Sequence, residues 1–252
     1  MIRRAAYLLA GATASGKSAA AAQLAREMGA AVLSADSMLV YRGMDVGTAK
    51  PPASERAEFD MGGVDVVTPA EHFSSGAWLR AAAAWLAGLP ADRPVVIVGG
   101  TGLYFSALLR GLDRRWTNPP PEYPVLQAER PVLHARIAAR LDTMFLDGLA
   151  AEVAALRAAY PVWSDTASAA IGYKEFIDGL PLAEVRERIL VRTRQLAKRQ
   201  DTWFRHQATP IWVPIGATAG ETASRVRRVW DAHGPWTVSL PDPDSVPSGA
   251  DI

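Results

Sequence analysis

The chain has 252 residues, 49% of them apolar, which is enough to bury the core of one or two domains. Its formal net charge is +1, so any surface for nucleic acid has to be a local cationic patch. The sequence contains no cysteine, which excludes disulfides and thiolate chemistry, and its four histidines lack the spacing of a histidine metal site.

The first half of the chain alternates short apolar runs with helical patterns. Alternation of this kind is typical of a parallel sheet covered by helices. The expected elements are, in chain order, a strand over 5–11, a helix over 17–28, a strand over 30–36, a helix within 74–89, a strand over 93–100 and a helix over 101–112.

The second half is mostly helical. A helical pattern over 130–160 starts with Pro131 in its first turn, and a long basic amphipathic helix covers 182–205. A strand over 208–215 and a helix over 220–233 complete the pattern. We therefore predict an α/β fold, a parallel sheet covered by helices, in a single domain over 1–236. Residues 237–252 are expected to be a disordered tail, because their end is rich in Pro, Asp, Ser and Gly.

The N-terminus pairs two arginines with a short apolar run, as a signal peptide does. This run leads directly into a glycine-rich turn, so a buried strand explains it better. No window of the sequence approaches 18 apolar residues, the length needed to span a membrane. We expect a soluble, cytoplasmic protein with no membrane partner.

A phosphate-binding loop follows the first predicted strand. The string GATASGKS fits the pattern G-x-x-x-x-G-K-[ST], in which backbone N–H groups, a helix N-terminus and a lysine hold phosphate oxygens. In this pattern the Ser18 hydroxyl is a ligand for Mg²⁺. The loop predicts that the parallel sheet is P-loop NTPase-like and that the domain over 1–236 is catalytic. The predicted phosphate-binding residues are Gly11, Ala12, Thr13, Ala14, Ser15, Gly16, Lys17 and Ser18.

Two further motifs are expected to meet this loop, because ligands bind beyond the C-terminal ends of parallel strands. One is SADS, which ends the second strand with Asp36; the other is GGTG, which ends the third. In a nucleotide hydrolase or kinase an acid that holds Mg²⁺ ends a neighbouring strand. Here the third strand ends in glycines, which leaves Asp36 as a Mg²⁺ ligand, a base or merely a cap.

The segment over 34–51 resembles the signature of tRNA dimethylallyltransferases, also called tRNA isopentenyltransferases. It matches the pattern D-S-x-x-x-Y-x-x-x-x-(I/V)-G-T-A-K-P. VGGTGLYFSALLRGL over 98–112, IGYKEF over 171–176 and TRQLAKRQDTWFR over 193–205 are similar to further motifs of the same family. With the phosphate-binding loop they occur in the family's order.

This resemblance implies transfer of the dimethylallyl group from dimethylallyl diphosphate to N6 of an adenine beside the tRNA anticodon. Asp36 is then the general base, Thr101 contacts the reacting groups, and Arg194 and Lys198 lie near the diphosphate, which the loop over 11–18 holds with Mg²⁺ on Ser18. The implied partners are the tRNA anticodon stem-loop and dimethylallyl diphosphate, and we expect a monomer. The residues implied in tRNA binding are Asp36, Ser37, Met38, Leu39, Thr101 and Arg199.

Some of these residue patterns have a structural interpretation as well. Between Arg186 and Arg205 there are seven Lys or Arg and two acids, a balance that a solvated helix face also shows. Trp203 and Phe204 are expected in the core. Tyr104 and Phe105 either line an apolar pocket for the isoprenoid or simply pack.

The chain departs from the family at one place. Members usually carry a helical insertion after the third motif that grips the anticodon stem, and here a proline-rich bridge over 113–122 stands instead. The string near residue 60, FDMGGVDVV, also lacks the expected histidines, and the sequence gives Tyr173 and Lys174 no role. Three alternatives therefore stay open: the same transfer to free adenine nucleotides, a P-loop small-molecule kinase, and a nucleic-acid-binding protein without turnover.

Overall fold

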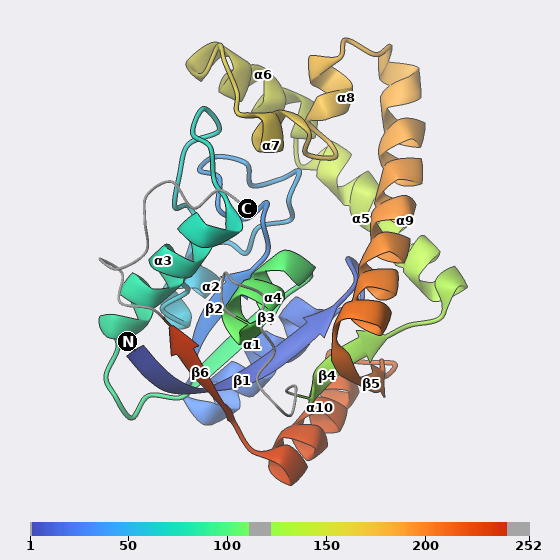
Figure 1. Cartoon of the computed structure of the whole chain (residues 1–252). Helices are drawn as coiled ribbons and strands as arrows, with labels where there is room; N and C mark the ends of the chain where they lie inside the picture. The colour runs from blue at the N-terminus through green and yellow to red at the C-terminus, as the bar shows by residue number, and fades with distance from the viewer. Residues whose placement is uncertain (1, 111–121, 241–252) are drawn as a thin grey trace.

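The computed structural model describes residues 2–110 and 122–240 of the chain (Figure 1). The strands of this described part are β1 (Ile2–Gly11), β2 (Ala31–Ala35), β3 (Val95–Gly99), β4 (Glu122–Gln127), β5 (Thr209–Pro214) and β6 (Trp236–Leu240). Its helices are α1 (Lys17–Met28), α2 (Ala53–Glu58), α3 (Ser75–Ala87), α4 (Gly102–Arg110), α5 (Arg130–Leu146), α6 (Leu149–Ala159), α7 (Asp165–Ser168), α8 (Lys174–Ile177), α9 (Leu182–Gln207) and α10 (Ala219–His233).

Five of these strands form a parallel sheet in the order β2-β3-β1-β4-β5, which confirms the predicted α/β fold. Each neighbouring pair is parallel, with Leu8 of β1 opposite Ile97 of β3, for example. The helices between them supply the crossovers that parallel strands need. The carboxyl ends of β1, β2 and β3 therefore lie at one edge of the sheet.

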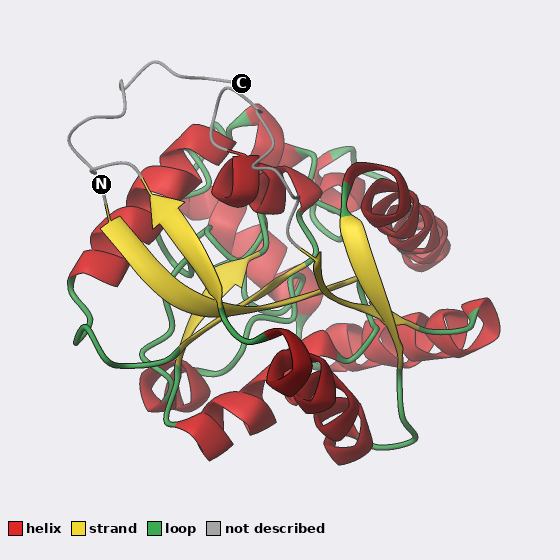
Figure 2. Ribbon diagram, turned by 60° about the horizontal axis from the view of Figure 1, so that its bottom comes forward, coloured by secondary structure: helices red, strands yellow, loops and turns green. Residues whose placement is uncertain are grey.

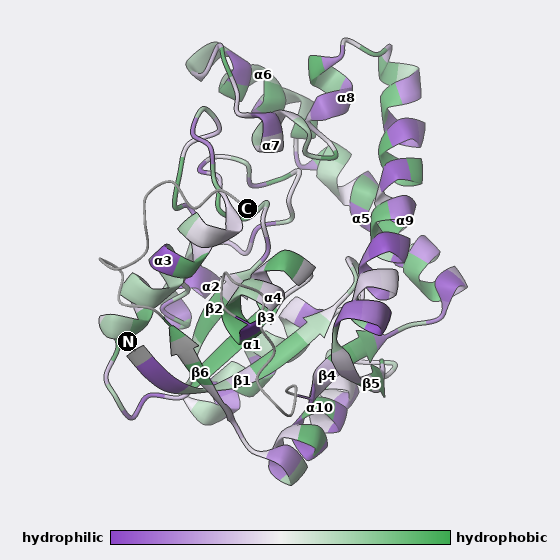
Figure 3. Cartoon of the chain, viewed as in Figure 1, coloured by the Kyte–Doolittle hydropathy of each residue, from purple (hydrophilic) through white to green (hydrophobic). Residues whose placement is uncertain are grey.

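Helices cover both faces of the sheet, as Figure 2 shows. Side chains of a strand alternate between faces, so Leu8 packs into one core and Leu9 into the other. The core around Leu9 is closed by α1 and α10, and the core around Leu8 by α3, α4 and α9. Figure 3 shows β3 and the later part of β1 in hydrophobic colours, whereas the start of β1 and many positions of α9 are hydrophilic.

A helical lobe extends from the sheet. The helices α5 and α9 pack against each other and run from the sheet towards α6, α7 and α8, which lie at the far end (Figure 1). The pattern over 130–160 thus forms two helices rather than one. They meet at Gly148, whose φ of 92° is in the left-handed region that favours glycine.

The structure places the first residues of the predicted tail, 237–240, in a strand. Trp236–Leu240 forms β6, which pairs antiparallel with the first half of β1. Its apolar residues recur at every second position, and Val238 and Leu240 are buried, so the segment over 237–240 belongs to the sheet. The rest of the expected tail, 241–252, and the proline-rich bridge up to residue 121 lie outside the described residues.

Among the described residues, every helix is too short or too polar to cross a membrane.

Candidate active site

The phosphate-binding loop joins the end of β1 to the start of α1, as predicted. Gly16 stands at the helix N-cap with a φ of 87°, a conformation that side chains other than glycine rarely adopt. The first turn of α1 begins with Lys17 and Ser18, so the positive end of the helix and a lysine face the same space. This geometry is that of an anion site at a helix N-terminus.

Two arginines of α5 reach the loop from the other half of the chain. The Arg140 guanidinium donates to Thr13 Oγ1 at 2.7 Å, and Arg136 donates to the Ser15 carbonyl at 3.3 Å. They stand four residues apart and therefore on one face of the helix. Neither arginine is predictable from the sequence, since only the R-x-x-x-R spacing hints at them and their partners lie more than 120 positions away.

The Lys17 ammonium is buried beside these groups. Its Nζ donates to the Ala12 carbonyl at 3.3 Å. The pKa of Lys17 is lowered to about 8, mainly by burial. Asp36 opposes this shift, and Arg140 adds to it. Burial also lowers the pKa of Arg140, again offset by Asp36. A bound anion would relieve both costs, because it favours the charged form of each group.

The ends of β2 and β3 are tied together beside the loop. The Ser37 N–H donates to Thr101 Oγ1 at 2.9 Å, and the Thr101 hydroxyl lies 3.2 Å from Ser37 Oγ. The Thr101 N–H donates to the Ala35 carbonyl, and Asp36 Oδ1 accepts the Met38 N–H at 2.9 Å. One carboxylate oxygen of Asp36 thus fixes the turn.

These elements enclose one cavity of about 850 Å³. It brings Lys17, Asp36 and Thr101 together, which confirms that the three strand-end motifs converge. The predicted residues that line it are Thr13, Lys17, Ser18, Asp36, Ser37, Met38, Leu39, Thr101 and Arg199. The other predicted residues of the loop shape its turn: Gly11, Ala12, Ala14, Ser15 and Gly16.

Part of the cavity wall is apolar and belongs to the helical lobe. Ile137 and Leu141 flank Arg140 on α5, and Met144 follows one turn later. Leu196 and Ile189 of α9 line the same cavity. Apolar side chains therefore stand directly beside the cations that contact the phosphate-binding loop.

The basic residues of α9 point in different directions. Arg199 lines the cavity, whereas neither Arg194 nor Lys198 is among the described residues that do so. Arg194 is about 140° around the helix from Arg199, given 3.6 residues per turn. Lys198 lines a second cavity of about 580 Å³ on the outer side of α9, which Arg199 and Trp203 also line.

Gln200 of α9 connects two of the motifs. Its Oε1 accepts the Thr13 N–H at 2.8 Å, and its Nε2 donates to the Gly100 carbonyl at 3.0 Å. The side chain thereby holds the phosphate-binding loop against the end of β3. Gln200 lies within the string over 193–205, but nothing in that string indicates this role.

The aromatic residues divide between core and cavity. Tyr104 is buried and stacks on Trp78 with ring centres 4.6 Å apart, and burial raises its pKa. Phe105 and Phe204 are fully buried and pack edge to face. Tyr104 and Phe105 therefore pack rather than line a pocket, and Phe204 is a core residue as predicted. Trp203 is half-buried: it packs against the core as predicted, edge to face with Phe204, and it also lines both cavities.

Comparison with known proteins gives two family models. The model described as "IPP transferase" matches residues 39–124 and 117–207, and one described as "Isopentenyl transferase" matches residues 4–60. The two matched segments of the first model meet at 117–124. The matches together extend over most of the chain.

Curated relatives are similar over nearly their whole length. The tRNA dimethylallyltransferase of Thiobacillus denitrificans is 34% identical over 304 residues, covering 90% of this chain and 96% of the relative. That of Xylella fastidiosa (strain M12) is 31% identical over 317 residues, covering 91% and 97%. Both alignments are longer than the 252 residues of this chain, so the relatives carry residues that it lacks.

Solved structures share the fold. The full-length tRNA isopentenylpyrophosphate transferase of Bacillus halodurans aligns with a TM-score of 0.78 and 26% identity, covering 91% of this chain and 96% of that one. The tRNA delta(2)-isopentenylpyrophosphate transferase of Staphylococcus epidermidis aligns with a TM-score of 0.77 at 22% identity, a likeness of fold alone. With the family models and the curated relatives, these matches show that the chain belongs to the tRNA dimethylallyltransferase family.

Proposed function

We propose that this protein transfers a dimethylallyl group from dimethylallyl diphosphate to N6 of an adenine beside the anticodon of tRNA. The observation that carries the proposal is the single cavity that combines an anion site, a carboxylate and an apolar wall. Each part suits one part of the reaction. The names of the curated relatives support the same activity.

The anion site suits the diphosphate. The N-terminus of α1, which begins with Lys17 and Ser18, lies at the same cavity as Arg140. Negative charge on the diphosphate grows as its bond to the alkyl carbon breaks, and preorganised donors and cations stabilise that charge. We assign Arg140 to this role on the strength of its contact with the loop, beside the predicted loop residues.

The donor set also fits Mg²⁺. Ser18 lines the cavity, and in a phosphate-binding loop of this pattern the hydroxyl of the Ser or Thr is a ligand for Mg²⁺. Groups of three or more His, Cys, Asp or Glu that could hold a metal are absent from the described residues. A Mg²⁺ ion bound to a diphosphate does not need such a group, because substrate phosphates and water can complete its shell. When bound it would neutralise charge on the diphosphate.

Asp36 is the proposed general base. The adenine amine is a weak nucleophile, because its lone pair is delocalised into the ring. As N6 forms its bond to the first carbon of the dimethylallyl group, the carbon–oxygen bond to the diphosphate breaks. The amine loses one proton, which a carboxylate oxygen of Asp36 within hydrogen-bond reach accepts. Thr101 holds the turn that presents this carboxylate.

The apolar wall suits the five-carbon group. The dimethylallyl group is bonded directly to the diphosphate, so the site needs apolar walls next to the anion site. Ile137, Leu141 and Met144 occupy that place beside Arg140. Phosphoryl transfer would not require such a wall, and β3 ends in glycines rather than in an acid, so a small-molecule kinase fits this cavity poorly.

The RNA acceptor is supported by the cationic side of α9. Arg199 lines the cavity while Lys198 continues the positive charge outwards. Phosphate contacts of this kind supply much of the affinity for nucleic acid. Residues 37–39 line the same cavity, which the target base would enter after leaving its stack. We further propose that one chain suffices, so that activity per chain is independent of protein concentration.

One experiment tests the proposal against its alternatives. The protein is incubated with dimethylallyl diphosphate and Mg²⁺, and either an anticodon stem-loop or AMP is offered as the acceptor. We expect a prenylated RNA adenine and release of diphosphate. The family model matches in two segments that overlap at 117–124, and the relatives are longer, which favours a missing insertion at this place. An enzyme without this insertion could use a free nucleotide, so AMP is the acceptor to compare with RNA. Prenylation of AMP without RNA would refute the tRNA proposal, and phosphorylation from ATP without prenyl transfer would refute both.

A further inference from the structure

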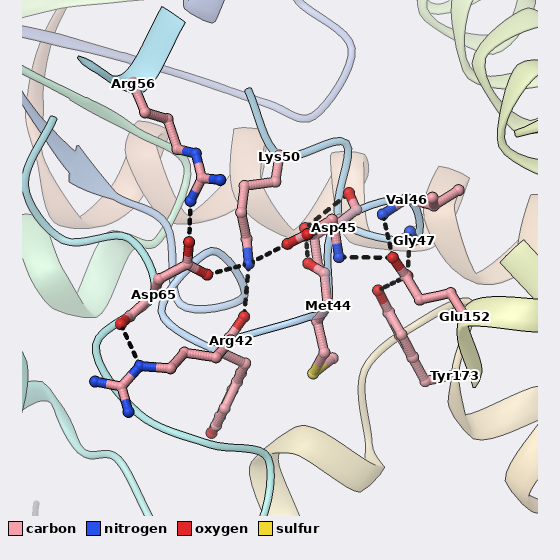
Figure 4. A network of polar contacts seen from close by, with 12 residues as sticks. Arg42, Met44, Asp45, Val46, Gly47, Lys50, Arg56, Asp65, Glu152 and Tyr173 are labelled. Carbon is pink, nitrogen blue, oxygen red and sulfur yellow. Dashed lines mark hydrogen bonds and ion pairs between the residues drawn. The ribbon is translucent and has the colours of Figure 1, made fainter. Parts of the chain in front are cut away.

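One carboxylate outside the cavity holds a long loop that forms part of its wall. Glu152 lies in the first turn of α6, and its Oε2 accepts the N–H groups of Asp45 and Val46 at 2.9 and 2.7 Å. Its Oε1 accepts the Gly47 N–H at 3.1 Å and the Tyr173 hydroxyl at 2.6 Å. Figure 4 shows these four donors converging on the one side chain.

Tyr173 closes the loop from the other side. The residue is fully buried at the start of α8, and burial together with the Glu152 contact raises the pKa of its hydroxyl. Its ring lies against Gly47 so closely that a Cβ on that glycine would stand 2.5 Å from a ring carbon. The glycine of the GTAKP string is therefore needed for close approach of the helical lobe.

The loop is also anchored to itself. The Lys50 side chain is only 1% exposed, and its ammonium contacts Asp45 at 2.6 Å and Asp65 at 2.7 Å. It also donates to the Tyr41 carbonyl at 2.6 Å. Burial lowers the pKa of Lys50, and the carboxylates of Asp45 and Glu152 oppose this shift. A rigid loop results, with Glu152 as its link to α6 and α8.

This loop is part of the cavity wall. Gly47, Thr48 and Ala49 line the cavity, and the same loop begins with Asp36. Glu152 and Tyr173 are not among the described residues that line it. The phosphate-binding loop is held by separate contacts, from Arg140 and Gln200. The loop over 45–49 and the phosphate-binding loop are thus held in place by different residues.

We propose that Glu152 is a positioning residue for the acceptor. This inference rests on the proposed function. By fixing the backbone over 45–47, Glu152 keeps the loop that starts at Asp36 in the shape that receives the RNA base. Glu152→Gln replaces one acceptor oxygen by an amide NH₂, which faces two donors and can accept from neither. We expect kcat/KM for the RNA acceptor to fall roughly tenfold, the scale of one or two lost charge-assisted hydrogen bonds.

The test compares three variants with the wild type. Glu152→Gln removes two of the four contacts, Tyr173→Phe removes one, and Glu184→Gln makes the same chemical change at an exposed position of α9. For each, three quantities are measured: the Kd for dimethylallyl diphosphate, kcat/KM for the anticodon stem-loop, and amide hydrogen exchange over 45–47. Thermal unfolding is recorded alongside.

We expect faster exchange at 45–47 and weaker RNA use in Glu152→Gln, with the Kd for the donor within about twofold of the wild type. Tyr173→Phe should show the same split to a smaller degree, and it carries the test if Glu152→Gln does not fold. Glu184→Gln should match the wild type. Unchanged kcat/KM in Glu152→Gln, or equal losses of donor binding and RNA use, overturns the inference. A wild type that transfers nothing to RNA overturns the proposed function and this inference with it.

Discussion

Replacing Asp36 by asparagine changes one acceptor atom of the cavity to a donor and leaves the size of the side chain unchanged. Oδ1 of Asp36 accepts the Met38 N–H at 2.9 Å, and the amide oxygen of asparagine can accept the same bond. The turn over 36–38 should therefore survive. An amide cannot take the proton that N6 of the adenine has to lose, so the effect should fall on the chemical step.

The size of the loss follows from the role. A positioned general base contributes a factor of about 10² to 10⁴. At about 1.4 kcal/mol for each factor of ten, this is roughly 3 to 5.5 kcal/mol of the barrier. Donor binding should change far less, because the loop, Lys17 and Arg140 remain. Since Asp36 raises the pKa of Lys17, the variant lysine should titrate below the wild-type value of about 8, and the assay is best run near pH 6.5.

Two measurements separate chemistry from binding. Single-turnover transfer to the anticodon stem-loop reports the chemical step, and calorimetry reports the Kd for dimethylallyl diphosphate with Mg²⁺. Asp92→Asn, at an exposed position, is the matched control. We expect Asp36→Asn to bind the donor within a few-fold of the wild type and to transfer at least a hundredfold more slowly. A rate close to the wild type would show that Asp36 is not the base.

Three further predictions concern the anion site and its supports. Arg140→Ala should raise the Kd for dimethylallyl diphosphate at least tenfold, because it removes a cation beside the loop. Arg130→Ala, at an exposed position of the same helix, should leave the Kd unchanged. Equal affinities of the two variants in calorimetry would contradict the role of Arg140. The affinity for dimethylallyl diphosphate should be constant up to about pH 7 and weaken as the pH rises through 8. The reason is that the pKa of Lys17 is about 8 in the free protein and only protonated Lys17 attracts the diphosphate. An affinity that does not change between pH 7 and 9 would speak against this. Lys50→Met should lower the free energy of unfolding, measured in denaturant titrations, by about 1–3 kcal/mol, a range that allows for the partial exposure of Asp45 and Asp65. Lys174→Met breaks only an exposed ion pair and should lower it by less than about 0.5 kcal/mol.

Local patterns predicted the elements that depend on local physics. The helix over 17–28 has the predicted bounds, because a glycine turn and a left-handed Gly29 delimit it. The alternation of strands and helices predicted the parallel sheet, and the strand-end motifs predicted the convergence at the cavity. Such features follow from the chain direction and the spacing of apolar residues.

Contacts between distant segments could not be predicted in this way. Arg140, Gln200 and Glu152 each contact a loop more than 100 positions away, and only the fold brings them there. The direction of Arg194 depends on how α9 is rotated against its neighbours, which a charge pattern does not fix. Likewise β6 has few residues and a partner at the other end of the chain, so its short alternating pattern alone does not distinguish it from the tail.

The pairing of β6 with β1 brings the two ends of the described chain together. Ile2 lies opposite Leu240, while the phosphate-binding loop follows Gly11 at the other end of β1. Nine residue steps at about 3.3 Å place the two ends roughly 30 Å from the loop. A fluorescent label or a surface tether attached near Ile2 or Leu240 would thus stand well clear of the cavity. A short linker between these neighbouring residues would also allow the chain to be opened at an exposed loop elsewhere, so that the order in which the strands are synthesised can be changed while the cavity is kept.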